Sequence, residues 1–420
     1  MFRKPLSALV LAFLTLPSSV RASNCAGTTT GLIPIPQLGS GLYQGYQGGL
    51  YPGGSNLRPT PHTNAGIALA SSIGPLDTLG NANVNGRVLL ISIGMSNATQ
   101  EFSHFVPKAM TYTARNPKLR VVDCAVGGQT AQLIRDPNYW YWKTVQERLT
   151  LNGSSLKQVQ AVWFKDANAN PTTGFPAAMV QLEDDFAEVV RVIHQKMPNA
   201  KLCYMTSRIY AGYASSTLNP EPYAYEAGFA VKGLIEQQLA GVDSLNFDPG
   251  HGPVEAPWLS WGPYLWADGL TPRSDGLTWQ CSEFVTTDGT HPSDDGREKV
   301  ADSLFAFFAH DQTTVPWFLG GNVASAPAGG RPLAFTVSPN PSRGEVAMTF
   351  VTRAGEPWRL EVLDATGRRV ARLGSGSGTG SAVTLRWGGA RDPAALYWAR
   401  LTRGASVETR RIVRLESAGR

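Results

Sequence analysis

Four nearly continuous apolar runs of strand length stand out in the middle of the chain. They cover residues 88–93, 119–125, 159–164 and 201–205, and such runs are typical of strands buried on both faces of a parallel sheet. Helical stretches alternate with them, and residues 179–196 show an apolar period near 3.6. The predicted helices cover 101–114, 139–149, 179–196, 223–239 and 296–308, the last behind Ser293 as a candidate cap. This alternation predicts βαβ units and an α/β fold.

The pattern changes to short alternating runs in the C-terminal part. Residues 320–332 have the Gly, Ala, Pro and Ser composition of a linker. Seven runs between 333 and 415 then predict an all-β immunoglobulin-like sandwich over residues 333–416. The Gly- and Ser-rich stretch 374–381 is expected to be a flexible hairpin loop, because it lacks the Lys and the following helix of a phosphate-binding loop.

The N-terminal part carries a different signal. Residues 1–22 combine Arg3 and Lys4, an apolar run over 6–16 and small residues before position 23, which predicts a cleaved signal peptide. The apolar run is too short for a membrane span, and no transmembrane segment is expected in the mature chain. Residues 23–84 are rich in Gly, Pro, Tyr and Asn and predict an irregular extension, followed by an α/β domain over 85–319.

Composition and charge agree with export and argue against a nucleic-acid-binding protein. Charged residues are only 16% of the chain, with 44 Gly and 29 Pro. The formal charge of +5 is uneven: residues from Arg331 onward carry 15 Arg, no Lys and 7 acids, whereas the chain upstream of them, without its leader, is at −6. The basic module suits an anionic surface on electrostatic grounds.

Four cysteines are compatible with disulfides in an exported protein. Cys25, Cys124, Cys203 and Cys281 allow three pairings if all are bridged, and the sequence does not choose among them. They have no C-x-x-C spacing and the histidines have no i, i+4 pair, so no metal site is expected.

Candidate chemistry follows the predicted strands, at the sheet edge where α/β proteins place their sites. Ser96 follows the first strand at the start of a helix, where backbone N–H groups favour negative charge. Gly128 follows the second strand, Asn168 the third, and Asp288 precedes His291 by three residues. Taken singly, each also fits a structural role, as an N-cap, a tight turn or an orienting hydrogen bond.

Together the four blocks resemble the SGNH (GDSL-like) esterase and acetylhydrolase superfamily over residues 85–312. The resemblance implies a flavodoxin-like three-layer α/β/α fold with no metal or cofactor. It implies Ser96 as nucleophile, His291 as general base and Asp288 as its orienting carboxylate. The oxyanion donors would be the N–H groups of Ser96 and Gly128 and the side chain of Asn168.

Two blocks depart from the family pattern. Met95 stands where Asp is commonest, although Gly-x-Ser-Asn is similar to the carbohydrate acetylesterase branch. In the third block Asp166 or Ala167 are alternatives to Asn168 at the aligned position.

An aromatic-rich stretch precedes Asp288. Trp258, Trp261 and Trp266, together with Asn97, are candidate substrate-binding residues, because exposed rings stack on sugars. The alternative is that the rings pack long loops.

The C-terminal module resembles the immunoglobulin-like domain of type IX sorting substrates and flagellar hook-cap proteins. The resemblance rests on residues 338–341, 363–368 and 396–401. It implies an export partner and a secreted or cell-surface protein; an accessory spacer or glycan-binding sandwich is the alternative.

The sequence therefore predicts a secreted serine esterase acting on small acyl esters, acetyl above all. Carbohydrate is the candidate alcohol, and an acylated polysaccharide the candidate partner. A lipid acyl hydrolase or thioesterase and a non-catalytic surface adhesin or glycan-binding protein are the alternatives.

Overall fold

A computed structural model describes residues 22–320 and, toward the C-terminus, residues 335–340, 342–352, 355–364, 368–379, 382–388, 393–404 and 406–415. The predicted signal peptide (except Ala22) and nearly all of the linker lie outside the described residues. The chain divides into two compact units, Met1–Val323 and Ala324–Arg420, and each has its own hydrophobic core.

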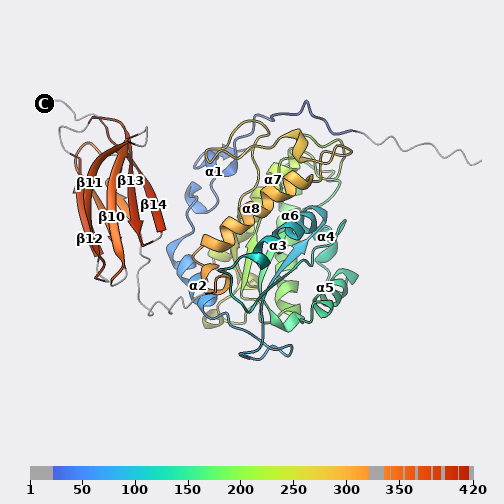
Figure 1. Ribbon diagram of the computed structural model, residues 1–420. Coiled ribbons are helices and arrows are strands. Elements are labelled where there is room, and N and C mark those ends of the chain that lie inside the picture. The colour runs from blue at the N-terminus through green and yellow to red at the C-terminus, as the bar shows by residue number, and fades with distance from the viewer. Residues whose placement is uncertain are drawn as a thin grey trace, which may run out of the picture. The chain divides into compact units, whose positions relative to one another are not determined.

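A five-stranded parallel sheet forms the centre of the first unit (Figure 1). Its strands are β3 (Val88–Gly94), β4 (Leu119–Val122), β5 (Val159–Lys165), β6 (Leu202–Met205) and β7 (Trp258–Trp261). Their order across the sheet is β4-β3-β5-β6-β7, with every neighbouring pair parallel. This is the flavodoxin-like order, so the α/β fold prediction is confirmed. Strand β7 was not predicted, because its four residues lie within the aromatic-rich stretch that the sequence indicated as loop.

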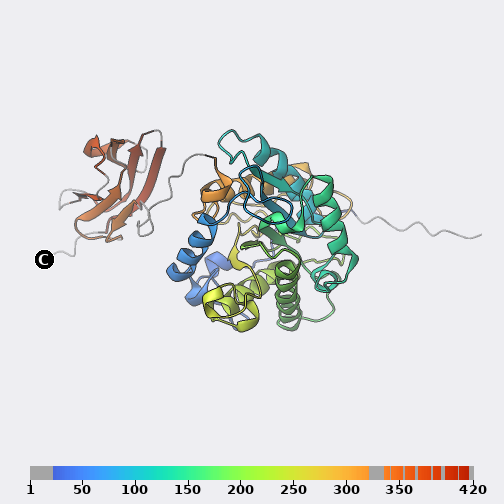
Figure 2. The ribbon, with the colours of Figure 1, turned by 90° about the horizontal axis from the view of Figure 1, so that it is seen from below.

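Helices cover both faces of the sheet (Figure 2). Helix α3 (Ser96–Thr111) packs on α8 (Asp294–His310), and α6 (Ala177–Lys196) packs on α7 (Tyr223–Leu239). Shorter helices after β3 are α4 (Ala131–Ile134), α5 (Trp140–Leu151) and α9 (Val315–Phe318). The two crossovers on either side of β3 leave the sheet in opposite directions, which opens a crevice at the carboxyl ends of β3 and β5.

The N-terminal extension is more regular than the sequence indicated. It contains α1 (Ile35–Leu38), a small ribbon of β1 (Leu42–Tyr43) and β2 (Tyr46–Gln47), and the 12-residue helix α2 (Thr60–Ser71). Helix α2 has no long apolar stripe, since its residues are mostly small. Small size is what its position requires: a Cβ on Gly66 would lie 2.4 Å from the Trp258 ring.

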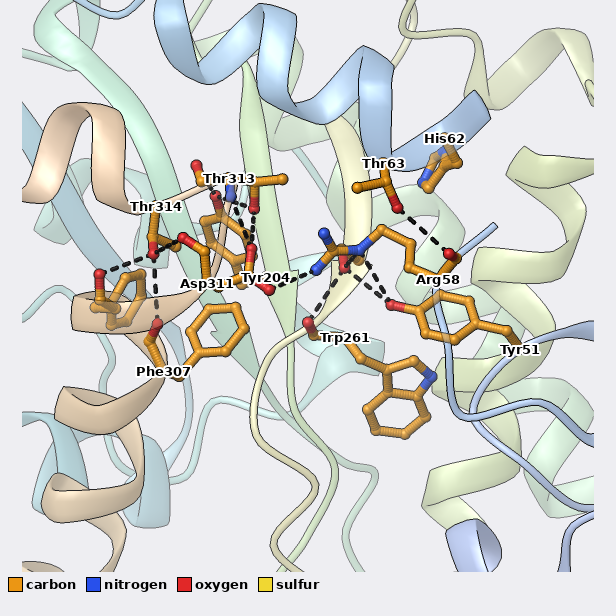
Figure 3. A network of polar contacts seen from close by, with 12 residues as sticks. Tyr51, Arg58, His62, Thr63, Tyr204, Trp261, Phe307, Asp311, Thr313 and Thr314 are labelled. Carbon is orange, nitrogen blue, oxygen red and sulfur yellow. Dashed lines mark hydrogen bonds and ion pairs between the residues drawn. The ribbon is translucent and has the colours of Figure 1, made fainter. Parts of the chain in front are cut away.

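A polar network joins this extension to the rest of the unit (Figure 3). The Arg58 guanidinium donates to Asp311 Oδ2 at 3.0 Å, just after α8, and to Ser260 Oγ on β7 at 2.8 Å. Tyr51 shares the hydroxyl of Ser260 at 3.0 Å. These contacts fix the extension against the edge of the sheet opposite to β4.

The second unit is a sandwich of two antiparallel sheets, as predicted. One has the order β11-β10-β13-β14 and the other β12-β9-β8. Alternate residues of each strand form the core between them, including Met348, Phe350, Leu360 and Leu401. The strand bounds are β8 (Thr336–Ser338), β9 (Val346–Val351), β10 (Pro357–Asp364), β11 (Arg369–Ser377), β12 (Ala382–Trp387), β13 (Leu396–Arg403) and β14 (Ser406–Val413).

The predicted hairpin loop at 374–381 is partly wrong. Residues Gly374 to Ser377 continue β11 and pair with β10. The indole of Trp358 lies against Gly374 and Gly376, at 3.2 and 3.4 Å from a Cβ placed on each. The ring supplies the packing that a glycine strand lacks, which explains why the strand extends into this stretch.

Candidate active site

Ser96 is the first residue of α3 and stands directly beyond the carboxyl end of β3. The turn that places it there depends on Gly94, whose φ is +143°. A Cβ on Gly94 would also lie 1.9 Å from the carbonyl oxygen of Lys165. Both the positive φ and the close approach exclude any residue but glycine at position 94. The end of β3 can therefore lie directly against the end of β5.

Three predicted residues form a continuous hydrogen-bonded chain. The Ser96 hydroxyl lies 2.8 Å from His291 Nε2, and His291 Nδ1 lies 2.7 Å from Asp288 Oδ2. With the proton on Nδ1 directed at Asp288, Nε2 is free to accept the proton of Ser96. The geometry expected for a nucleophile and its base is therefore present, although 195 residues separate them in sequence.

The loop itself holds the carboxylate of Asp288 in place. Its Oδ1 accepts from the backbone N–H of Thr290 at 2.8 Å and of His291 at 3.0 Å. Burial raises the pKa of Asp288, but these bonds and the bond from the His291 ring outweigh it and lower the pKa below its usual value. The carboxylate is thus charged at neutral pH, as the partner of an imidazolium must be.

Asn97 joins helix α3 to the loop that carries His291. Its amide nitrogen donates to the Thr290 carbonyl at 3.2 Å, and the side chain is buried. The prediction that Asn97 binds substrate is not supported, since its side chain faces the protein interior. The structure instead assigns it to the positioning of His291 beside Ser96.

Two backbone N–H groups border Ser96 without an acceptor. In the described part of the chain, neither the N–H of Ser96 nor that of Gly128 donates a hydrogen bond. Gly128 has a φ of +76°, which favours glycine. The preceding Gly127, which sequence analysis did not single out, lies so close that a Cβ on it would be 3.7 Å from the Cβ of Ser96. The turn after β4 therefore passes beside Ser96, where an oxyanion would form.

The amide of Asn168 is engaged in other contacts. Its Nδ2 donates to Asp185 Oδ2 at 2.6 Å, and its Oδ1 accepts from the N–H of Gln132 at 3.0 Å. These bonds fix the orientation of the side chain after β5. A role as third oxyanion donor stays a prediction and depends on the second N–H of the amide.

A buried ion pair lies behind Ser96 and was not found from the sequence. Glu101, one turn along α3, contacts Lys165 at the end of β5, and both side chains are fully buried. Burial lowers the pKa of Lys165 to about 8, although Glu101 opposes the shift. Burial also raises the pKa of Glu101, which Lys165 and Arg208 oppose. The only local sign of this pair was a charged residue within an otherwise apolar strand end.

The predicted tryptophan platform is not formed. Trp258, Trp261 and Trp266 are buried, with at most 3% of their surface exposed. Their indole N–H groups donate to His62 O, Leu50 O and Glu221 Oε1. The rings pack the extension and the long loops into the core, so their faces are not available to a sugar.

A disulfide connects the extension to the loop region of His291. Cys25 is bonded to Cys281, whereas Cys124 and Cys203 are buried free thiols. Next to the bridge, the N–H of Ser23 donates to the Thr286 carbonyl at 2.8 Å and that of Asn24 to the Tyr213 carbonyl at 2.8 Å. The sequence left the pairing open, and the fold decides it.

A second Asp-x-x-His element shows how little the local motif decides. His251 Nδ1 lies 2.9 Å from Asp248 Oδ2, much as in the pair His291 and Asp288. The His251 side chain is 80% exposed, however, whereas that of His291 is 20% exposed and bonded to Ser96. Of the two pairs, Asp288 and His291 form the one whose imidazole contacts a serine hydroxyl.

Two further properties of the described residues concern metal ions and membranes. Among the described residues, no group of three or more His, Cys, Asp or Glu side chains is arranged to hold a metal ion. No helix in that part of the chain is long and apolar enough to cross a membrane.

Comparisons with known proteins give low similarities. No protein-family model matches the chain, and no curated protein matches it. Among solved structures, protein YXIM from Bacillus subtilis has 12% identity and a TM-score of 0.32, covering 54% of this chain and 57% of that one. The periplasmic domain of a lipopolysaccharide acetyltransferase from Salmonella Paratyphi A has 13% identity and a TM-score of 0.30, covering 59% and 95%. A carbohydrate acetylesterase from Xanthomonas citri has 11% identity and a TM-score of 0.29, covering 77% and 80%. Similarity at this level assigns no function to this chain.

Proposed function

We propose that the protein is a serine esterase that hydrolyses small acyl esters through an acyl-enzyme on Ser96. The observation that carries the proposal is the unbroken chain from the Ser96 hydroxyl through His291 to Asp288, with contacts of 2.8 and 2.7 Å. An adhesin has no evident use for such a series of hydrogen bonds, because a serine that only binds a ligand needs no base beside it. The geometry therefore favours an enzyme over the binding alternative.

In the proposed reaction Ser96 Oγ attacks the ester carbonyl while His291 Nε2 takes the hydroxyl proton. The oxyanion that forms is held by the free N–H of Ser96 at the start of α3 and by the free N–H of Gly128 in the turn after β4. His291 returns the proton to the departing alcohol, which leaves Ser96 acylated. Water then loses a proton to His291 and attacks the acyl group. His291 returns that proton to Ser96 Oγ as the acyl–oxygen bond breaks, which releases the carboxylic acid and restores the free serine.

The substrate proposal is an acetyl ester of a carbohydrate. It rests on the resemblance of Gly94-Met95-Ser96-Asn97 to the carbohydrate acetylesterase branch. The tryptophans give it no support, since the rings that could have formed a sugar platform are buried. A lipid acyl hydrolase differs in the chain length it accepts. A series of p-nitrophenyl esters from acetate to palmitate separates the two: a carbohydrate acetylesterase prefers acetate, and a lipase prefers the longer chains.

The test of the mechanism compares the wild type, Ser96→Ala and Ser103→Ala on p-nitrophenyl acetate and acetylated xylan. Ser103 is an exposed serine on the same helix and controls for effects on α3. Loss of the nucleophile is expected to lower kcat by about 10⁵-fold or more, whereas Ser103→Ala keeps full activity. Equal activity of wild type and Ser96→Ala would refute the nucleophile. Inactivity of the folded wild type on every ester would favour the binding protein.

We also propose that residues 1–22 direct export and that the sandwich is a sorting domain of the type IX kind. The separate core of the sandwich supports a module that the α/β unit does not need for folding. A protein truncated after residue 332 is expected to keep esterase activity. It should no longer reach the cell surface or the medium of the native host.

A further inference from the structure

The four-stranded sheet of the C-terminal unit presents a grid of side chains on its outward face, with two register shifts between β10 and β11. Leu360 and Val362 of β10 and Ala399 and Leu401 of β13 face the core, so the residues between them face outward. Strand register aligns these outward residues in three rows across the sheet. From β11 toward β14 the rows are Ser375, Arg359, Thr402; then Arg372, Glu361, Arg400, Thr409; then Arg369, Leu363, Trp398, Arg411. Figure 1 shows the strands side by side.

This outward face is strongly basic. Five of the residues in the three rows are arginines, and Glu361 is the single acid among them. The side chains of Arg369 and Arg400 are 57% and 42% exposed, whereas that of Glu361 is 4% exposed. Arg359, Arg372 and Arg411 are also exposed. Among the described residues of the three rows, guanidinium groups are therefore the exposed charges, and the Glu361 carboxylate lies beneath them.

Glu361 organises the grid. Its two carboxylate oxygens pair with Arg369 at 3.0 Å and with Arg400 at 2.9 Å, so the two guanidinium groups are held at fixed positions on neighbouring strands. Hydrogen bonds from Arg400 and Arg369 lower the pKa of Glu361, which keeps it charged near neutral pH. Exposed arginines that are fixed in this way can still offer N–H groups to an anion in a bidentate manner.

We propose that this outward face of β11-β10-β13-β14 binds an acidic polysaccharide. Strands about 4.8 Å apart and rows about 7 Å apart, with two register shifts between β10 and β11, place guanidinium groups from four strands on one face, which suits a polymer with repeated carboxylate groups. The half-buried Trp398 lies in the same row as Arg369 and Arg411 and offers an indole for stacking on a sugar ring. The proposal does not depend on the esterase function.

Two features favour a polysaccharide over other polyanions. A flat sheet face has no protruding helix or ribbon to enter a nucleic-acid groove. It also has few exposed apolar side chains for insertion into a membrane: among the described residues, Leu363 is 9% exposed and lies beside Trp398, and Leu396 at the start of β13 is 38% exposed. The guanidinium groups of Arg369 and Arg400, which Glu361 holds in place, match the discrete carboxylates of a polysaccharide better than the diffuse charge of a membrane surface.

The test uses the full mature chain in affinity electrophoresis with polygalacturonate, and with dextran as the uncharged polymer. The variant is Arg359→Gln/Arg372→Gln/Arg411→Gln, which leaves both ion pairs of Glu361 intact. A matched control, Lys143→Gln/Lys157→Gln/Arg386→Gln, removes the same charge from exposed positions that do not belong to the three rows. Wild type and control are expected to be retarded by polygalacturonate in a salt-sensitive way and not by dextran. The face variant is expected to bind at least about tenfold more weakly.

Three results would overturn the proposal. One is equal retardation of the face variant and the control, which would show that the charge acts without regard to position. Another is tighter binding of wild type to oligo(dT) or to phosphatidylglycerol vesicles than to polygalacturonate. The third is wild-type affinity in Arg359→Lys/Arg372→Lys/Arg411→Lys, which would exclude recognition by the guanidinium fork. Unchanged thermal unfolding of each variant confirms that the sandwich is folded.

Discussion

Replacement of Asp288 by Asn tests the arrangement of the site with the least change in shape. In the wild type, Asp288 Oδ1 accepts from the N–H groups of Thr290 and His291, and Oδ2 faces His291 Nδ1 at 2.7 Å. In Asp288→Asn the amide oxygen can keep the two backbone bonds, so the loop is expected to stay in place. The amide NH₂ then faces Nδ1 and requires that nitrogen to be an acceptor.

The consequence for catalysis follows from the tautomer of His291. With Nδ1 as acceptor, the ring proton moves to Nε2, which then cannot take the proton of Ser96 at 2.8 Å. The charge that stabilises the imidazolium is lost as well. We expect kcat to fall by about 10⁴-fold, which corresponds to about 5 kcal/mol of transition-state stabilisation. Because the backbone bonds are kept, the free energy of unfolding should change by less than about 1 kcal/mol.

The assay is the initial rate of p-nitrophenyl acetate hydrolysis, with KM and kcat measured separately and urea unfolding measured in parallel. Asp248→Asn is the matched control, since Asp248 makes the same contact with His251 at 2.9 Å. That pair is far more exposed and does not contact Ser96. The control should keep wild-type kcat. If folded Asp288→Asn retains more than about a tenth of wild-type kcat, then Asp288 does not set the tautomer of His291.

Three further predictions concern the buried groups and the disulfide. Lys165→Met leaves Glu101 buried without its partner and should lower the free energy of unfolding, measured with urea, by about 3–5 kcal/mol. The double variant Lys165→Met/Glu101→Leu should recover most of that loss. A Lys165→Met variant as stable as wild type would contradict the pairing. Burial raises the pKa of Glu221 from 4.5 to about 7, so the folded chain holds a proton that the unfolded chain releases, and the free energy of unfolding contributed by this group falls as the pH rises from about 4.5 to 7. Glu221→Gln should lose that slope in unfolding curves recorded between pH 4.5 and 8, and an identical slope would show that other groups cause it. Cys281→Ser removes the bridge to Cys25 and should lower the free energy of unfolding by about 2–5 kcal/mol in non-reducing buffer, an effect that should disappear when both proteins are compared under reducing conditions.

Much of the fold could be predicted because its signals are local. The apolar runs at 88–93 and 159–164 correspond to β3 and β5, and the predicted helix 223–239 has the same bounds as α7. Runs of this kind are the direct consequence of burial on both faces of a strand or on one face of a helix. Helix α2 and strand β7 were missed, since the mostly small residues of α2 and the four-residue length of β7, within an aromatic-rich stretch, give no clear period.

The sequence by itself determined which blocks follow which strands, and therefore that Ser96, Gly128 and His291 could meet at one edge of a parallel sheet. Only the tertiary structure decided that His291 rather than His251 meets the serine, because the two Asp-x-x-His elements are alike until the chain folds. It also turned the tryptophans inward, paired Cys25 with Cys281, and placed arginines from separate strands on one face. Each of these depends on contacts between residues far apart in sequence, which no local pattern encodes.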